Sequence, residues 1–207
     1  MSLSVLHVIP TLDPLAGGTT AALAGMAGAQ ADAGLDVHVV STYPETDTDT
    51  FGPQLTQRGV KVTLIGPANN SLRRHPNLGP TLRRKISQAD LVHVHAVWEE
   101  PQHLALKLGS ALGKPVILSP HGMLDRWSLA QSRLKKQLYL AWRLRRNLRR
   151  VTALHYTTDE ERESVGRFGL PGEALVIPLG LDLHEFCLLY TSPSPRDLST
   201  SRMPSSA

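Results

Sequence analysis

Three short polar segments carry residue types that can do chemistry, and each lies at or after the end of an apolar run. Gly17-Gly18-Thr19 comes after the run 5–9 and its polar loop, 93–100 (His-Val-His-Ala-Val-Trp-Glu-Glu) ends the run that starts at Leu91, and 119–123 (Ser-Pro-His-Gly-Met) follows a run from Pro115. Apolar runs of this length predict buried strands. In an open parallel sheet, ligands sit beyond the carboxyl ends of the strands, so we expect the three segments to converge.

The glycine segment suits an anion. An Ala-rich stretch from Thr20 to Ala33 has the composition of a helix, with Thr19 or Thr20 as the expected N-cap. Unpaired N–H groups at a helix N-terminus favour a phosphate, and glycine lets the backbone approach it. The loop is neither G-x-G-x-x-G nor a P-loop with its lysine, so it does not indicate a dinucleotide or ATP site. A simple tight turn is the alternative.

The two histidines of the second segment share one face of the strand by the period of two. We expect His93 to be a packed, hydrogen-bonded residue, while His95 lies nearer the strand end. A two-histidine metal site fits the spacing, but the sequence offers no evident third ligand, so we predict no metal. Trp98 is either a platform for a sugar ring or a lid on the core.

His121 is the strongest single candidate for a catalytic residue. It follows Pro120 and precedes Gly122, just past an apolar strand. A histidine there can exchange hydrogen bonds with a hydroxyl or a phosphate oxygen near neutral pH. The structural alternative is a histidine that satisfies buried loop carbonyls.

Strands and helices alternate along the chain, which predicts an α/β fold with a parallel sheet and helices on both faces. The expected strands are 5–9, 36–41, 61–65, 91–95, 115–119, 151–156 and 174–177. The expected helices are 20–33, 51–58, 78–88, 102–112, 126–150 (as one helix or two) and 159–168.

Composition narrows the class of protein. The chain has 207 residues, 41% of them hydrophobic, one cysteine and a net charge of +4. A single cysteine excludes an internal disulfide, and the sequence shows neither a membrane-spanning run nor a signal peptide, so we expect a cytoplasmic protein. Nine Lys and Arg residues and no acidic residue fall between Arg126 and Thr158. This basic segment fits a solvated face, an anionic acceptor or an anionic membrane surface better than nucleic acid.

The segments together resemble the N-terminal half of a family 4 glycosyltransferase of the GT-B type, over about residues 4–186. The resemblance is carried by His7-Val-Ile-Pro10 with Gly17-Gly18, by 90–95 with Trp98, by 119–123 with Trp127 and Lys135-Lys136, by 154–158 with Glu160-Glu161, and by 176–182 with Phe186. Within 176–182, Leu179 replaces the asparagine usual in the family.

The resemblance implies a Rossmann-like domain at 4–183 on the acceptor side of a cleft whose other wall binds a nucleotide-sugar. Such enzymes retain anomeric configuration and usually need no metal or other cofactor. The resemblance places Gly17, Gly18 and Thr19 by the donor diphosphate and His121 by the transferred sugar. It assigns the glycan or lipid-linked acceptor to His95, Trp98, Gly122, Met123 and Arg126. The expected function is sugar transfer in polysaccharide biosynthesis, with peripheral contact to the inner face of the plasma membrane as an option, and this chain alone is expected to be inactive.

Two other functions remain open. One is a sugar-nucleotide epimerase of the same architecture, for which Glu99 and Glu100 are the only evident carboxylate pair near the site. The other is a nucleotide- or sugar-binding module without catalysis. The tail from Cys187 to Ala207 is rich in Ser and Pro and resembles the translation of a sequencing adapter, so we expect it to be non-native and to lie outside the fold.

Overall fold

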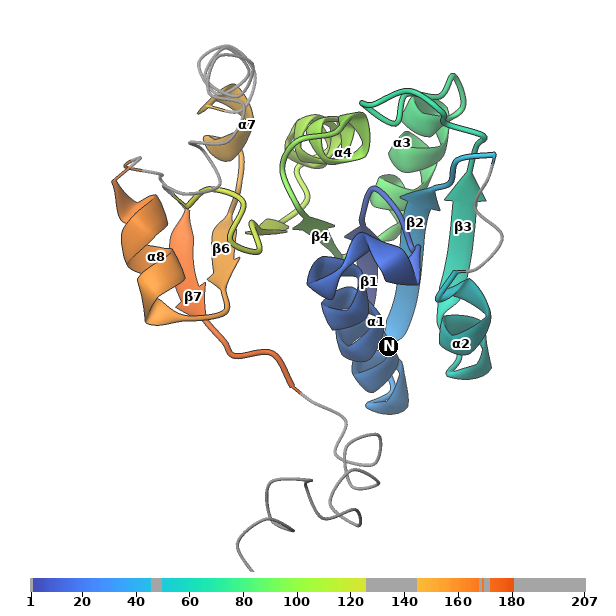
Figure 1. Cartoon of the computed structure of the whole chain (residues 1–207), viewed down its shortest axis with the longest axis horizontal. Helices are drawn as coiled ribbons and strands as arrows, with labels where there is room; N and C mark the ends of the chain where they lie inside the picture. Colours follow the sequence, from blue (N-terminus) through green and yellow to red (C-terminus); the bar gives the residue numbers. More distant parts are fainter. Residues whose placement is uncertain (1, 46–49, 126–144, 168, 170–171, 181–207) are drawn as a thin grey trace, which may run out of the picture.

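The computed structural model describes residues 2–45, 50–125, 145–167, 169 and 172–180. Seven strands form one sheet in the order β3-β2-β1-β4-β5-β6-β7, and every pair of neighbours is parallel (Figure 1). The strands are β1 (Ser4–Val8), β2 (Asp36–Thr42), β3 (Lys61–Ile65), β4 (Leu91–His95), β5 (Val116–Ser119), β6 (Ala153–Tyr156) and β7 (Glu173–Val176). The predicted Rossmann-like α/β fold is confirmed, and each predicted strand is present within two residues at either end.

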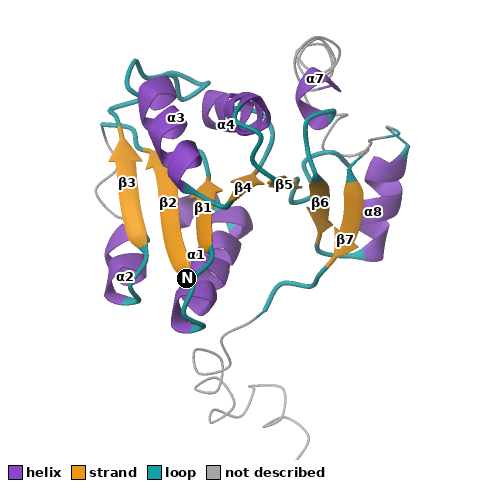
Figure 2. Ribbon diagram, turned by 180° about the vertical axis from the view of Figure 1, so that it is seen from behind, coloured by secondary structure: helices purple, strands orange, loops and turns teal. Residues whose placement is uncertain are grey.

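Helices cover both faces of the sheet, as predicted. They are the 3-10 turn η1 (Pro14–Ala16) and the helices α1 (Gly18–Asp32), α2 (Gly52–Gln57), α3 (Leu78–Gln88), α4 (Glu100–Ala111), α7 (Arg145–Leu148) and α8 (Asp159–Gly166). Figure 2 shows α1 and α2 on one side of the strands and α3 and α4 on the other. The predicted helix 126–150 is described only at α7, and the rest of that segment lies outside the described residues.

Alternation along the strands gives the sheet two chemically different faces. Leu6, Val8, Val92, Val94 and Leu118 belong to one large apolar cluster that also contains the buried leucines of α3 and α4. The residues between them point to the opposite face, where α1 lies. There, His7 pairs in register with His93, and His95 pairs with Ser119. The face toward α1 therefore carries polar side chains in the middle of the sheet.

Helix α1 begins differently from our prediction. Its N-cap is Gly17, with a φ of 99° and no side-chain cap, so neither Thr19 nor Thr20 caps it. The reason is the unpredicted turn η1, which Asp13 caps by accepting a hydrogen bond from Leu15 N at 2.8 Å. The chain then needs a left-handed residue at Gly17 to enter the helix, and glycine adopts that conformation freely.

The C-terminus of α1 ends in a Schellman motif. Gly34, as predicted, adopts a positive φ (87°) just past the helix. Leu35 N donates to Gln30 O at 3.1 Å, which closes the last turn. This motif fixes the last turn of α1, which contains Gln30.

Candidate functional site

The segments predicted to carry chemistry converge at the carboxyl edge of the sheet. β4 lies between β1 and β5, so the loop after β1, the residues after β4 and the loop after β5 follow neighbouring strands. At this edge Gly17 and Gly18 are exposed at the N-terminus of the 15-residue helix α1. Within the described chain, the amides of Gly18 and Thr19 make no hydrogen bond, so they are open to an anion.

Imidazole rings connect β1 with the loop after β5. His7 Nδ1 lies 3.0 Å from His95 Nε2, and His95 Nδ1 lies 3.0 Å from His121 Nε2. The other end of this row is Gln30 of α1, whose Oε1 lies 2.7 Å from His7 Nε2. His7 and His95 are completely buried, whereas His121 is half-buried. We call this row, Gln30–His7–His95–His121, the imidazole relay.

A second row of hydrogen bonds runs beside the relay. His93 Nε2 lies 2.8 Å from Ser119 Oγ, and Ser119 Oγ lies 2.9 Å from His155 Nδ1. His155 Nε2 then donates to Ile177 O at 2.9 Å. The rings of His93 and His95 stack with centroids 4.3 Å apart. His93 is therefore packed and hydrogen-bonded, as the sequence predicted.

Burial keeps the relay uncharged near neutral pH. Desolvation lowers the pKa of His7 to about 4, against the raising effect of its hydrogen bond to Gln30. Burial also lowers the pKa of His95 and His93 well below the usual value, and neighbouring imidazoles lower both further. Desolvation lowers the pKa of His121 to about 4, although the nearby Glu161 carboxylate acts in the opposite direction.

Three of these histidines are also close enough to share a metal ion. His7, His93 and His95 each offer a ring nitrogen, and the three atoms lie within 4.8 Å of one another. The third ligand, which the sequence did not reveal, comes from β1. However, the relay and the Ser119 bond already give these buried rings hydrogen-bond partners. Each of the three rings therefore has at least one hydrogen-bond partner, and the absence of a metal stays a prediction.

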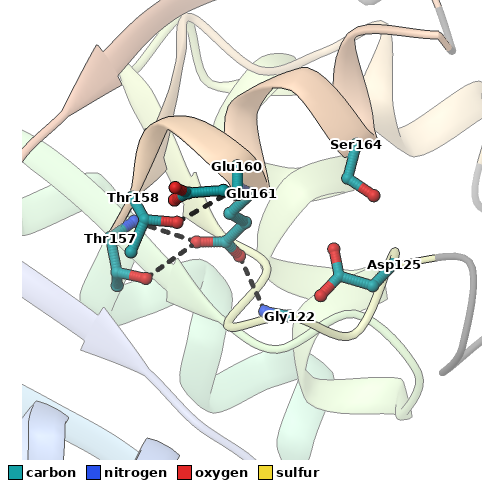
Figure 3. A pocket seen from close by; sticks show the side chains of 7 residues that line it. All are labelled: Gly122, Asp125, Thr157, Thr158, Glu160, Glu161 and Ser164. Carbon is teal, nitrogen blue, oxygen red and sulfur yellow. Dashed lines mark hydrogen bonds between the residues drawn. The ribbon is translucent and has the colours of Figure 1, made fainter.

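His121 stands in a strained turn beside an acidic pocket. Its φ is 52° and that of Gly122 is 72°, so two consecutive residues are left-handed. The turn is held by Glu161 of α8, whose carboxylate accepts hydrogen bonds from Gly122 N at 2.7 Å and from Thr157 N at 2.9 Å (Figure 3). Glu161 thus ties the loop after β5 to the loop after β6.

The pocket itself has a volume of about 440 Å³ and is rich in oxygen atoms. Figure 3 shows Asp125 and Ser164 facing each other across it, with Glu160 and Glu161 on α8. Asp125 Oδ1 is buried and has no hydrogen-bond partner among the described residues. The lining residues are Gly122, Asp125, Thr157, Thr158, Glu160, Glu161 and Ser164. Carboxylate and hydroxyl oxygens accept hydrogen bonds from hydroxyl groups, whereas carboxylates repel phosphate.

The remaining predicted site residues have varied positions. His95 has both ring nitrogens bonded to other imidazoles and is completely buried, so the structure gives its side chain no surface for an acceptor; the prediction of direct contact is not supported. Trp98 and Met123 are partly buried against the apolar cluster. This packing matches the alternative in which Trp98 is a lid on the core. Arg126 lies outside the described residues.

Comparison with known proteins identifies the family. A family model described as a glycosyl transferase 4-like domain matches residues 17–180. The chain belongs to the glycosyl transferase 4-like family. The match spans the whole edge described above, from the glycine loop to the segment after β7. No curated protein matches the chain.

Solved structures show that the fold of this glycosyl transferase 4-like chain recurs in GT-B glycosyltransferases. Anabaena Alr3699/HepE, solved in complex with UDP and glucose, is 18% identical with a TM-score of 0.58; 95% of this chain covers 48% of that one. A glycosyltransferase from Rickettsia africae is 13% identical with a TM-score of 0.57, and 94% of this chain covers 51% of it. A UDP-N-acetylglucosamine 2-epimerase from Rickettsia bellii is 14% identical with a TM-score of 0.53, with 96% of this chain covering 52% of it.

This glycosyl transferase 4-like chain therefore spans about half the length of those proteins. The described residues contain no helix that is both long and apolar enough to cross a membrane. The predicted tail 187–207 and most of the predicted basic segment lie outside the described residues, so neither prediction is tested.

The sequence predicted no chemical role for several residues of the site, among them Gln30, His7 and Asp125. Gln30 gave one signal, because it is the only residue of α1 with a long polar side chain. His7 stood in a short apolar strand, where an imidazole needs a partner. Asp125 gave none. The contacts of all three residues depend on which helices and strands are neighbours in space. This arrangement cannot be read from a single sequence.

Proposed function

We propose that this chain forms the acceptor-side wall of a retaining glycosyltransferase that transfers a sugar from a nucleotide-sugar to a glycan or lipid-linked acceptor. The observation that carries the proposal is the pairing, at one edge of the sheet, of an open helix N-terminus with an imidazole beside a pocket lined by carboxylates and hydroxyls. The family and the fold support the class of reaction.

The donor diphosphate belongs at the glycine loop. The free amides of Gly18 and Thr19 and the dipole of α1 offer a positive partial charge, and Gly17 and Gly18 leave the backbone uncovered. A Cβ at Gly17 or Gly18 would meet nothing within 4 Å, so the space beside them is open. Charge developing on the departing diphosphate would be stabilised here, while the rest of the nucleotide binds to the other half of the protein.

The sugar hydroxyls belong near His121 and the acidic pocket. Glu160 and Asp125 can accept hydrogen bonds from an acceptor glycan, and their charge disfavours phosphate, which separates this end of the site from the diphosphate end. His121 would contact the transferred sugar. Catalysis would then rest on placing the acceptor hydroxyl and on stabilising the leaving group, with no metal or cofactor.

Substitution of two histidines tests this assignment. In a protein that carries both walls of the cleft, His121→Ala should lower kcat/KM by about 100-fold or more, because it removes a group that touches substrate. His93→Ala should mainly lower stability, because its ring bonds only to Ser119 in the described chain. Transfer of radiolabelled sugar and urea unfolding measure the two effects. Wild-type turnover in His121→Ala would refute the role of His121.

The epimerase alternative has one observation in its favour. Burial raises the pKa of Glu99, and proton abstraction from a sugar needs a carboxylate near the site. However, Gln102 Nε2 already donates to Glu99 Oε2 at 3.2 Å, and Glu100 pairs with Arg74 at 3.4 Å. Product analysis with the same protein decides: transfer to an acceptor supports the glycosyltransferase, and an epimerised nucleotide-sugar supports the alternative.

A further inference from the structure

We propose that Gln30 is a positioning residue that sets the tautomer of His121 through the imidazole relay, leaving His121 Nδ1 as a hydrogen-bond acceptor for a sugar hydroxyl. Gln30 stands on α1, and its side chain reaches His121 only through His7 and His95. The fixed tautomer follows from geometry alone. The identity of the hydroxyl rests on the proposed function.

The relay forces its three histidines to share one tautomer. Each link joins Nδ1 of one ring to Nε2 of the next. In neutral rings one nitrogen of each linked pair must carry the proton and the other must accept it. If His95 carries its proton on Nε2, then His7 must accept with Nδ1, and His121 must donate with Nε2. Protonation of His95 on Nδ1 would reverse both links together.

Gln30 decides between these two states. Its carbonyl Oε1, 2.7 Å from His7 Nε2, can only accept, so His7 carries its proton on Nε2. His95 and His121 then follow, with protons on Nε2 as well. His7 and His95 are completely buried, so water has little access to break the row. His7 and His95 have both ring nitrogens hydrogen-bonded, so of the three rings only His121 can offer a nitrogen to a ligand.

The consequence for substrate is specific. His121 Nε2–H is used within the relay, and Nδ1 has no hydrogen-bond partner among the described residues. A neutral imidazole with a free Nδ1 lone pair accepts a hydrogen bond from a hydroxyl and cannot donate one to a phosphate oxygen. The carboxylates beside it present acceptors as well, so this end of the site uniformly suits a ligand rich in hydroxyl groups.

Tautomers can be read directly in the 207-residue chain. Long-range 1H–15N correlation spectra at pH 7.5, with 15N-labelled histidine, distinguish Nε2–H from Nδ1–H in each ring. In the wild-type chain we expect His7, His95 and His121 all in the Nε2–H form. Two substitutions of Gln30 test its control. Gln30→Lys can only donate, and should convert all three rings to Nδ1–H, whereas Gln30→Met should leave them as a mixture.

Thr63→Val is the matched control. It removes the hydroxyl that lies 2.8 Å from His38 Nε2, outside the relay, and should change only the His38 signals. A wild-type spectrum with His121 in the Nδ1–H form, or with the three rings in different forms, would overturn the proposal even if a variant failed to fold. So would a Gln30→Lys chain in which His7 changes while His95 and His121 do not. None of these spectra depends on sugar transfer, so they judge the relay separately from the proposed function.

Discussion

In the middle of the sheet, the side chains on the two faces are buried in opposite ways, although an apolar cluster of Leu23, Ala27, Val37 and Val39 also lies between α1 and β2. Toward α3 and α4, the central strands present Val and Leu side chains, which are stable because they leave water. Toward α1, the same strands present His7, His93, His95, Ser119 and His155, which are stable only because each finds a partner. The apolar face needs only volume and shape, whereas the imidazole face needs particular atoms at particular distances. Burial on the imidazole face therefore costs free energy wherever a partner is missing, and the relay on this face ends at His121.

The difference between the faces should be largest on acidification. The native pKa values of His7 and His121 are about 4, below the 6.5 of an unfolded chain, and those of His93 and His95 are lower than usual in the same direction. As pH falls below 6.5, these histidines bind protons in the unfolded chain but not in the native chain. Their contribution to the free energy of unfolding is therefore complete above about pH 7.5 and is lost toward pH 4. Burial of neutral His7 alone should lower the free energy of unfolding by roughly 2 kcal/mol at pH 5.0 relative to pH 7.5. Urea unfolding at pH 7.5, 6.0 and 5.0 measures the total. Equal stability at all three values would mean that these rings are not desolvated.

The next largest effect should come from the apolar face and should not depend on pH. Leu118 is completely buried among the residues that face α3 and α4. Leu118→Ala should lower the free energy of unfolding by about 2–5 kcal/mol, because it removes buried methyl groups and leaves a cavity. The loss should be the same at pH 7.5 and 5.0. Leu64→Ala, at a site 39% exposed on β3, is the control and should cost far less. A Leu118 effect that changed with pH would show that the two faces are not independent.

The sequence predicted the apolar face better than the imidazole face, and the reason is physical. Apolar runs such as 91–95 and 115–119 predict buried strands directly. The strands, the parallel sheet and the convergence of three loops therefore followed from local pattern. Even the division of His93 and His95 from Val92 and Val94 followed from the period of two. The apolar face can be predicted without knowledge of its exact contacts, because many sets of apolar side chains pack acceptably.

The imidazole face depends on register and on the approach of a helix. His7 meets His93 and His95 only because β1 lies beside β4 in one particular register, and Gln30 meets His7 only because α1 crosses at one height. Neither the strand register nor the position of α1 can be read from the residues around His95. The sequence therefore predicted that His95 contacts the acceptor, whereas in the structure it is an inner link of the relay. The N-cap of α1 was missed for a similar reason, since the turn at Pro14–Ala16 moves the helix start to Gly18.

The smallest of the three effects should come from breaking one bridge on the imidazole face. Ser119 is completely buried, and its hydroxyl lies between His93 Nε2 and His155 Nδ1. Ser119→Ala leaves both nitrogens without that partner, and should cost about 1–3 kcal/mol by urea unfolding at pH 7.5. Ser41→Ala is the matched control, because Ser41 is equally buried on β2 but makes only a 3.3 Å bond to a backbone carbonyl. If the two substitutions cost the same, partner atoms do not stabilise the imidazole face, and the contrast between the faces reduces to one of shape.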